Sequence, residues 1–174
     1  MNDTRHYGYL DQNNDDFVIH TAKDQIMSGI PIGIILLTVG YPIVPGNVAN
    51  ASTFHFPVRY VNVPQVNSPR LHTVDPTIIE DLTEAGLELE RSGVRAIICS
   101  CGYFGYWQRE LAERLHVPVY ASRLLQLPLI KVGLKKNQKV GVLCAVERTF
   151  TPKLLAACGV DDPGICVVKC META

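Results

Sequence analysis

A cysteine followed by a glycine stands where a strongly apolar segment ends. The segment VRAIICS (94–100) has the pattern of a buried strand, and the turn CGYFG (101–105) leads into a helical segment. Backbone N–H groups at the start of a helix and its partial positive charge favour a thiolate over a thiol. The same N–H groups can hold a carboxylate, and Gly102 lets the backbone approach a ligand closely. Cys101 is therefore predicted to be a reactive thiol, whereas Cys99, inside the strand, is predicted to be a core residue.

A second group of polar side chains follows an earlier apolar segment, PIGIILLTV (31–39). The loop GYPIVPGNVANAST (40–53) carries amide and hydroxyl groups that can orient a carboxylate or an amine. An Asx-rich surface loop has the same composition, so a structural role and a binding role stay open.

Strand-like and helix-like segments alternate along the chain and must position these groups. Strands are expected at 31–39, 56–63, 94–100, 117–121, 139–145 and 164–170. Helices are expected from Asp75-Pro76 until just before Gly93 (apolar face Ile78, Leu82, Ala85 and Leu89), after 101–105, from 122 until Pro128 interrupts, and at 151–159.

This alternation predicts an α/β fold with a parallel sheet and helices on both faces. In such folds ligands bind beyond the carboxyl ends of the strands. That rule selects three places: the loop after Val39, the turn after Ser100 and the segment after Cys144.

The composition excludes several classes of protein. With 174 residues, 47% hydrophobic and 19% charged, the chain is expected to have a real core rather than to be disordered. A net charge of −1 and scattered basic residues give no reason to expect a nucleic-acid partner. Residues 1–29 are predicted to be a polar lead-in without a targeting segment, and the apolar run 30–39 is too short to cross a bilayer.

The six cysteines favour free thiols. Cys99, Cys144 and Cys166 lie in apolar strand-like runs, where buried free thiols are common, and a chain of this size does not need disulfides. None of the six forms a CxxC pair or has a histidine at ligand spacing, so no metal site is expected. The chain is therefore expected to be cytoplasmic.

Three blocks of sequence resemble successive blocks of the aspartate/glutamate/hydantoin racemase superfamily. They are GIILLTVGYPIVPGNVANASTFHFPVRY, SCGYFGYWQRELAERLHVPVYASRLLQLPLI and KVGVLCAVERTFTPKLLAACGV. The resemblance covers residues 30–174 and implies Rossmann-like α/β lobes, of which the second is incomplete because the family's C-terminal portion is missing. It also implies chemistry without a cofactor: one cysteine removes the proton on the substrate's α-carbon, and a second returns a proton to the opposite face.

Carried over by position, Cys101 is similar to the family's first catalytic cysteine. The resemblance implies substrate-binding roles for its neighbours and for polar positions of the first loop: Asn47, Asn50, Thr53, Ser100, Gly102 and Tyr103. Asn47 stands at a position where members of the family commonly have an aspartate. The motif that holds the second cysteine is absent; Cys144, at a strand end, is the one stand-in, and a core thiol is the expected role for it.

The sequence thus predicts a racemase-family protein that acts on an amino acid or a related small carboxylate through cysteine acid/base chemistry. Two alternatives stay open: a single-cysteine enzyme similar to the family's decarboxylase or isomerase relatives, and a truncated, non-catalytic ligand-binding remnant. The expected partner is a small molecule, with no nucleic acid and no membrane. A homodimer is allowed, because an incomplete second lobe would expose apolar strand surface.

Overall fold

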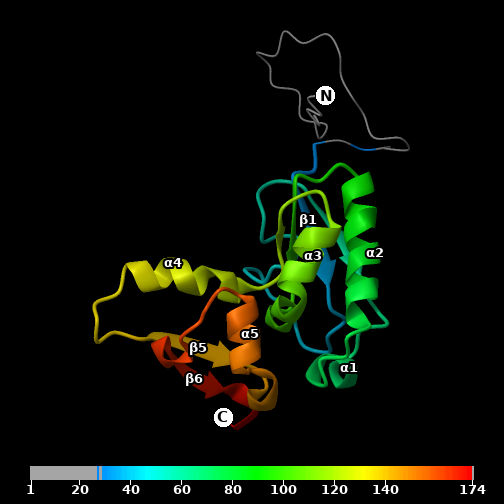
Figure 1. Ribbon diagram of the computed structural model, residues 1–174. Coiled ribbons are helices and arrows are strands. Elements are labelled where there is room, and N and C mark those ends of the chain that lie inside the picture. The colour runs from blue at the N-terminus through cyan, green and yellow to red at the C-terminus, as the bar shows by residue number, and fades with distance from the viewer. Residues whose placement is uncertain (1–26, 28, 174) are drawn as a thin grey trace, which may run out of the picture.

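The computed structural model describes Met27 and residues 29–173. The polar lead-in expected over 1–29 lies outside these described residues, apart from Met27 and Gly29. The described chain folds into two lobes (Figure 1), which we call the first lobe, residues 29–121, and the second lobe, residues 122–173. Each lobe has its own parallel sheet and its own group of buried apolar side chains.

The first lobe is built on four parallel strands. They are β1 (Ile32–Leu36), β2 (Val58–Asn62), β3 (Ala96–Cys99) and β4 (Val119–Tyr120), in the order β2-β1-β3-β4. Consecutive residues of β1, Ile34 and Ile35, are both fully buried, as is expected of a parallel strand that is covered on both faces. The predicted α/β class with a parallel sheet is confirmed.

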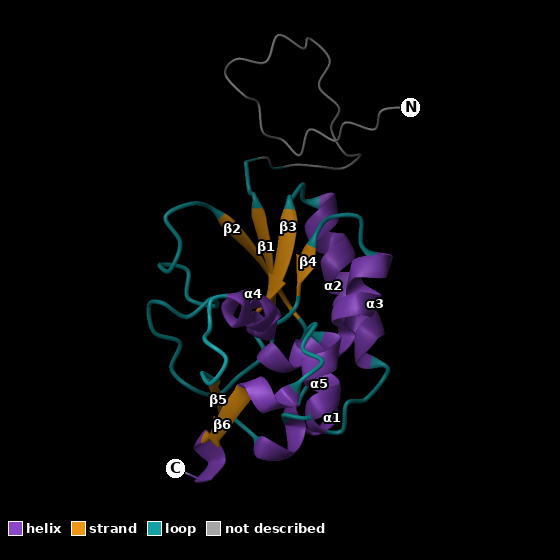
Figure 2. Ribbon diagram, turned by 60° about the vertical axis from the view of Figure 1, so that its left-hand side comes forward, coloured by secondary structure: helices purple, strands orange, loops and turns teal. Residues whose placement is uncertain are grey.

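The helices of the first lobe lie on one side of this sheet (Figure 2). They are α1 (Ser68–His72), α2 (Ile78–Arg91), the 3-10 helix η1 (Gly102–Trp107) and α3 (Gln108–Arg114). Helices were expected on both faces, but β1 connects to β2 through the Pro- and Gly-containing loop 37–57, which forms no helix. The short helix α1 was not predicted.

Helix α2 buries the predicted apolar face and ends at Arg91; Gly93, two residues beyond, has a φ of 83°, the left-handed conformation that favours glycine. The helix begins two residues later than Asp75-Pro76 suggested. The Asp75 carboxylate accepts hydrogen bonds from the N–H and the hydroxyl of Thr77, which closes a turn before the helix.

Helix α3 covers the free edge of β4. The Gln108 side-chain amide donates to the Val119 carbonyl (2.9 Å) and its oxygen accepts from the Ala121 N–H (2.7 Å). One side chain therefore satisfies backbone groups that a neighbouring strand would otherwise bind.

The second lobe holds a two-stranded parallel sheet of β5 (Val140–Cys144) and β6 (Cys166–Cys170). Its helical elements are η2 (Arg123–Gln126), α4 (Leu127–Val132), η3 (Glu147–Thr149), α5 (Pro152–Ala157), η4 (Pro163–Ile165) and η5 (Met171–Thr173). The prediction that Pro128 interrupts a helix is wrong, because Pro128 lies in the first turn of α4, where a missing N–H costs no hydrogen bond. The predicted helix with a Thr151 cap is confirmed, since Thr151 accepts from the Leu154 N–H.

The outer face of the second sheet is bare. Leu143 and Val167 are 76% and 58% exposed, and a Cβ added at Gly141 would meet nothing within 4 Å. The strands of the first sheet run with their carboxyl ends toward the second lobe (Figures 1 and 2). The edge at which a ligand is expected therefore lies where the two lobes meet.

Candidate functional site

Cys101 lies two residues beyond Cys99, the last residue of β3, and still has an extended backbone, with φ −112° and ψ 124°. Helix η1 begins at the next residue, and the Cys101 carbonyl accepts from the Phe104 N–H at 3.1 Å. The strand positions Cys101 at the sheet edge because Cys99 and Ile97 anchor the preceding residues in the first core. The predicted arrangement of strand end, cysteine and helix start is present.

The charge balance at the thiol differs from the prediction. Burial raises the pKa of Cys101 above its ordinary value of 9.0, and this is the largest influence. The nearby backbone N–H groups of Tyr103 and Phe104 lower the pKa, as does the positive charge of Arg123. The predicted N–H groups are therefore in place and Arg123 adds to them, but burial outweighs both, and the thiol is favoured over the thiolate at neutral pH.

Ser100 ties the end of β3 to the end of β1. Its Oγ accepts from the Leu37 N–H at 2.9 Å, and its own N–H donates to the Ile35 carbonyl at 2.9 Å. The loop that follows β1 therefore starts directly beside Cys101.

The three predicted polar residues of that loop hydrogen-bond within the loop itself. Asn47 accepts from the Ala49 N–H, and Asn50 donates to the Ile43 carbonyl and accepts from Ser52. The Thr53 hydroxyl donates to the Asn47 carbonyl at 2.6 Å and accepts from the Gly46 N–H. These are Asx-turn and related contacts, so the structural role that the composition allowed is the one seen.

Tyr103 connects the Cys101 turn to the second lobe. Its hydroxyl donates to the Val146 carbonyl (3.0 Å) and accepts from the Val146 N–H (2.8 Å), just beyond the end of β5. Burial raises the pKa of Tyr103, and the nearby thiols of Cys144 and Cys101 act in the same direction. The turn after β3 and the segment after β5, two of the three predicted places, therefore meet at this tyrosine.

Cys144 is a buried thiol, as expected of a core residue. It lies in register with Cys170 of the neighbouring strand, and both are less than 10% exposed. Burial and a hydrogen bond with the Cys170 thiol raise the pKa of Cys144 to about 12. A thiol with this pKa is a poor acid/base partner for Cys101 near neutral pH.

Two residues at the carboxyl end of β4 belong to the site and were not predicted. Ser122 packs against the Cys101 turn: a Cβ added at Gly102 would lie 3.8 Å from its Oγ. The next residue, Arg123, is exposed, and its charge acts on the Cys101 thiol. The signal was available, because β4 follows β3 in the sheet and its carboxyl end obeys the same rule.

Among the described residues, no cluster of three or more His, Cys, Asp or Glu side chains could hold a metal ion. In the same part of the chain, every helix is too short or too polar to cross a membrane. The chemistry that the arrangement offers is that of one thiol, two backbone N–H groups and one guanidinium at the edge of a parallel sheet.

No protein-family model matches the chain. It is 28% identical over 154 residues to a dimethylsulfoniopropionate lyase of Durusdinium sp. clade D, covering 84% of this chain and 51% of that protein. It is 26% identical over 166 residues to dimethylsulfoniopropionate lyase 3 of Emiliania huxleyi, covering 91% of this chain and 42% of that protein. The chain thus spans about half the length, or less, of these relatives, and they are named as lyases, not racemases.

Among solved structures, an aspartate racemase homologue from Pyrococcus horikoshii is similar with a TM-score of 0.44 and 17% identity. The match covers 82% of this chain and 66% of that one.

Proposed function

We propose that this chain supplies the proton-accepting thiol, Cys101, of a lyase that acts on dimethylsulfoniopropionate or a closely related sulfonium carboxylate. Relatives that cover 81% to 91% of the chain at 24% to 28% identity are named as lyases of this compound. The observation that carries the proposal is the position of Cys101 at the carboxyl end of β3, where two N–H groups and a guanidinium support its anionic form.

The proposed reaction is a β-elimination. The Cys101 thiolate takes a proton from the carbon next to the carboxylate, and the electrons of that C–H bond form a C=C bond. The bond between the next carbon and the sulfonium sulfur breaks, and its electrons return to sulfur. Dimethyl sulfide and acrylate are released, and Cys101 then gives its proton to water.

This proposal keeps the first step that the sequence predicted and changes the second. A racemase and this lyase both remove a proton α to a carboxylate. A racemase needs a second acid to return the proton, whereas a sulfonium on the neighbouring carbon leaves instead, so a single thiol suffices. Cys144 stays a thiol, because its pKa is about 12 and it is hydrogen-bonded to the Cys170 thiol. A lyase, which needs no second acid/base, therefore fits the structure better than a racemase.

The test is release of dimethyl sulfide. The purified chain is incubated with dimethylsulfoniopropionate, and headspace dimethyl sulfide and dissolved acrylate are measured together. We expect equal amounts of both products above the buffer rate. Cys101→Ser is expected to lose about 100-fold or more, the scale of a removed acid/base. Cys166→Ser is the matched control, because Cys166 is a partly exposed thiol of β6, away from the Cys101 turn.

A second measurement separates binding from turnover. Alkylation of Cys101 by iodoacetamide is followed by mass spectrometry with and without the substrate. Slower alkylation with no dimethyl sulfide would show a ligand-binding protein and overturn the lyase. No protection and no product would overturn the proposed substrate as well. Product release that survives in Cys101→Ser would overturn the role of the thiol.

A further inference from the structure

We infer that Arg123 binds the carboxylate of the substrate beside Cys101, and that this residue makes the site selective for small anions. The substrate named above rests on the proposed function, but the anion selectivity concerns the geometry of this site alone.

The sheet register brings the two residues together. Ile97 pairs with Val119, and Ile98 with Tyr120, in the parallel ladder of β3 and β4. Continued by three residues along each chain, that register sets Cys101 opposite Arg123. Cys101 (φ −112°) and Ser122 (φ −145°) are themselves extended, while the chain bends at Ser100 and η2 begins at Arg123, so the register brings Cys101 and Arg123 near one another without pairing their backbones. Neighbouring strands lie roughly 4.8 Å apart, so a guanidinium on Arg123 is within reach of a ligand held at Cys101.

Close packing holds the backbone before Arg123 against the helix that follows Cys101. The side chain of Ser122 would lie 2.9 Å from a Cβ added at Gly105, so the backbone that precedes Arg123 touches the helix that follows Cys101. Ser122 is buried and its hydroxyl accepts from the Leu124 N–H, which holds the start of η2 in place. The base of the Arg123 side chain is therefore anchored while its end is exposed.

Arg123 is available for a ligand. Its side chain is exposed and, among the residues that the structure describes, no carboxylate pairs with it. By contrast, Arg70 and Arg114 of the same lobe are paired with Asp75 and Glu80. A planar guanidinium suits a carboxylate because it can form two parallel hydrogen bonds.

The other predicted anion-binding groups are already occupied. Asn47, Asn50 and Thr53 bond within their own loop. The Phe104 N–H donates to the Cys101 carbonyl. A carboxylate beside Cys101 thus needs another donor, and Arg123 is in position to provide it. The same charge also lowers the pKa of Cys101, which keeps the thiolate accessible next to an anion.

Two alkylating reagents test this selectivity without requiring turnover. Iodoacetate carries a carboxylate and iodoacetamide does not, while both react with the same thiolate. The ratio of their rates at Cys101 therefore reports anion attraction, and effects on the thiolate population cancel. We expect Arg123→Gln to lower this ratio about fivefold, as an exposed ion pair allows, and Arg123→Lys to keep most of it.

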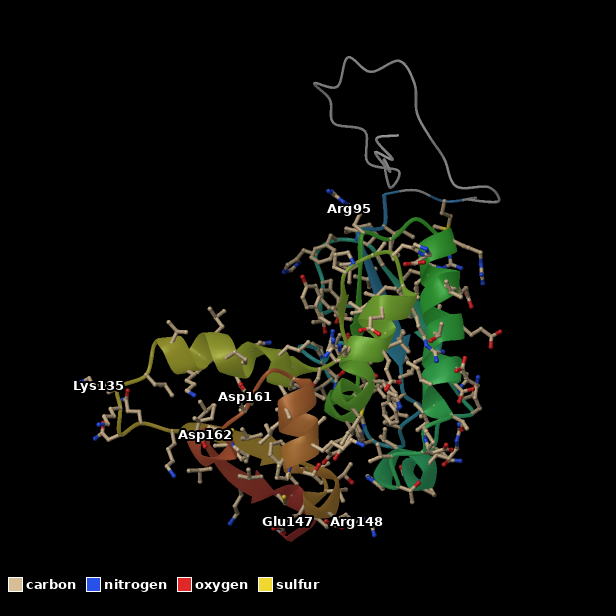
Figure 3. All side chains as sticks on the ribbon, in the orientation of Figure 1. Arg95, Lys135, Glu147, Arg148, Asp161 and Asp162 are labelled. Atoms are coloured by element: carbon tan, nitrogen blue, oxygen red, sulfur yellow. The ribbon has the colours of Figure 1, made fainter. Side chains whose placement is uncertain are left out.

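Arg95→Gln is the matched control. Arg95 is an exposed arginine of the same lobe at the opposite, amino-terminal edge of β3 (Figure 3), and its replacement should leave the ratio unchanged. Unfolding midpoints in urea establish that each variant is folded. An unchanged ratio in folded Arg123→Gln, or an equal fall in Arg95→Gln, would overturn the inference.

The outcome is separable from that of the proposed function. A ratio that depends on Arg123 in a protein that releases no dimethyl sulfide would keep the anion site and reject the lyase. Dimethyl sulfide release with unchanged KM and kcat in Arg123→Gln would keep the lyase and reject Arg123 as the carboxylate-binding residue.

Discussion

The Cys101 thiol lies between opposing influences. Burial favours its protonated form, whereas two N–H groups and the Arg123 charge favour the thiolate. The net direction is an elevated pKa, so the thiol predominates at neutral pH and the thiolate, the form that can take a proton from carbon, is the minor one. A carboxylate that approaches Arg123 would remove part of the support for the thiolate and strengthen the base further.

The elevated pKa predicts an alkaline reactivity profile for Cys101. Its folded pKa lies above 9.0, so the thiolate fraction, and with it the alkylation rate by iodoacetamide, should keep rising as the pH passes 9. The protonated thiol stabilises the fold below the unfolded pKa, and that contribution is lost as the pH rises through the folded value. Peptide mass spectrometry at a series of pH values gives the midpoint.

The same peptide in denaturing urea is the control. Its midpoint should fall toward 9.0 once burial is lost. A folded midpoint at or below the unfolded one would show that the N–H groups and Arg123 outweigh burial.

Some of the site was predictable from sequence, and some was not. The position of Cys101 followed from an apolar strand that ends in a glycine turn, which is a local pattern. The hydrogen bonds of the Asn50 side chain with Ile43 and Ser52 depend on how the loop folds back on itself, and the composition of the loop does not reveal that. Arg123 was missed because its link to Cys101 is a register between strands that lie more than twenty residues apart along the chain.

At the scale of elements, η1 and α5 approach each other closely at Gly105. A Cβ added there would lie 2.6 Å from the Cys158 Sγ, 2.9 Å from the Ser122 Cβ and 3.1 Å from the Leu154 Cδ1. The glycine is needed for this approach and not for a special backbone angle. It sets the distance between the helix after Cys101 and the second core.

Gly105→Ala is therefore expected to lower the free energy of unfolding by about 1–3 kcal/mol, through overpacking. Urea unfolding of the variant measures this. Cys158→Ala removes the sulfur that the new methyl group would strike, so the double variant should lose less than the sum of the single losses.

Gly141→Ala serves as the comparison, since its added Cβ would meet nothing within 4 Å. A loss at Gly105 no larger than that at Gly141 would mean that η1 and α5 can move apart freely.

Elements were predicted better than their boundaries. All six strands and helices α2, α3 and α5 fall within predicted segments, because each has a clear apolar period or run. Helix α1 has five residues and a single buried side chain, Leu71, which is too short a pattern to detect. Pro128 was misjudged because a proline can either end a helix or stand in the first turn of a new one. Which of the two occurs depends on where the preceding helix ends, and the residue type alone does not show that.

At the scale of the whole molecule, three aromatic or imidazole side chains of the first lobe hold one segment of the second. Tyr103 bonds Val146, Tyr106 bonds the Thr149 carbonyl and the Thr151 hydroxyl, and His72 bonds the Thr149 hydroxyl. Tyr103 and Tyr106 are three residues apart in a 3-10 helix, so their side chains lie on one face. The lobes are thus joined at the Cys101 turn itself.

Tyr103→Phe should loosen this junction. It removes both hydrogen bonds to Val146, and a lost hydrogen bond of about 1 kcal/mol corresponds to about fivefold faster local opening. Hydrogen exchange followed by mass spectrometry should show faster exchange in the peptide that contains Val146, with peptides of β1 unchanged.

Tyr120→Phe is the paired control, because Tyr120 is 55% exposed on β4. Equal exchange at Val146 in both variants would contradict a joining role for the Tyr103 hydroxyl.

The homodimer stays a prediction, and the exposed outer face of β5 and β6, with Leu143 and Val167, is the surface on which it would be sought.

The two cores divide the chain almost without overlap. Every buried member of the first core lies between Ile30 and Ala121, and every buried member of the second lies between Leu124 and Val160. During synthesis the first lobe can therefore bury its apolar side chains before the second lobe has emerged from the ribosome. Tyr103 and Tyr106 would then already lie on the surface of a folded lobe when the segment from Val146 to Thr151 is synthesised, and that segment could bind to them directly.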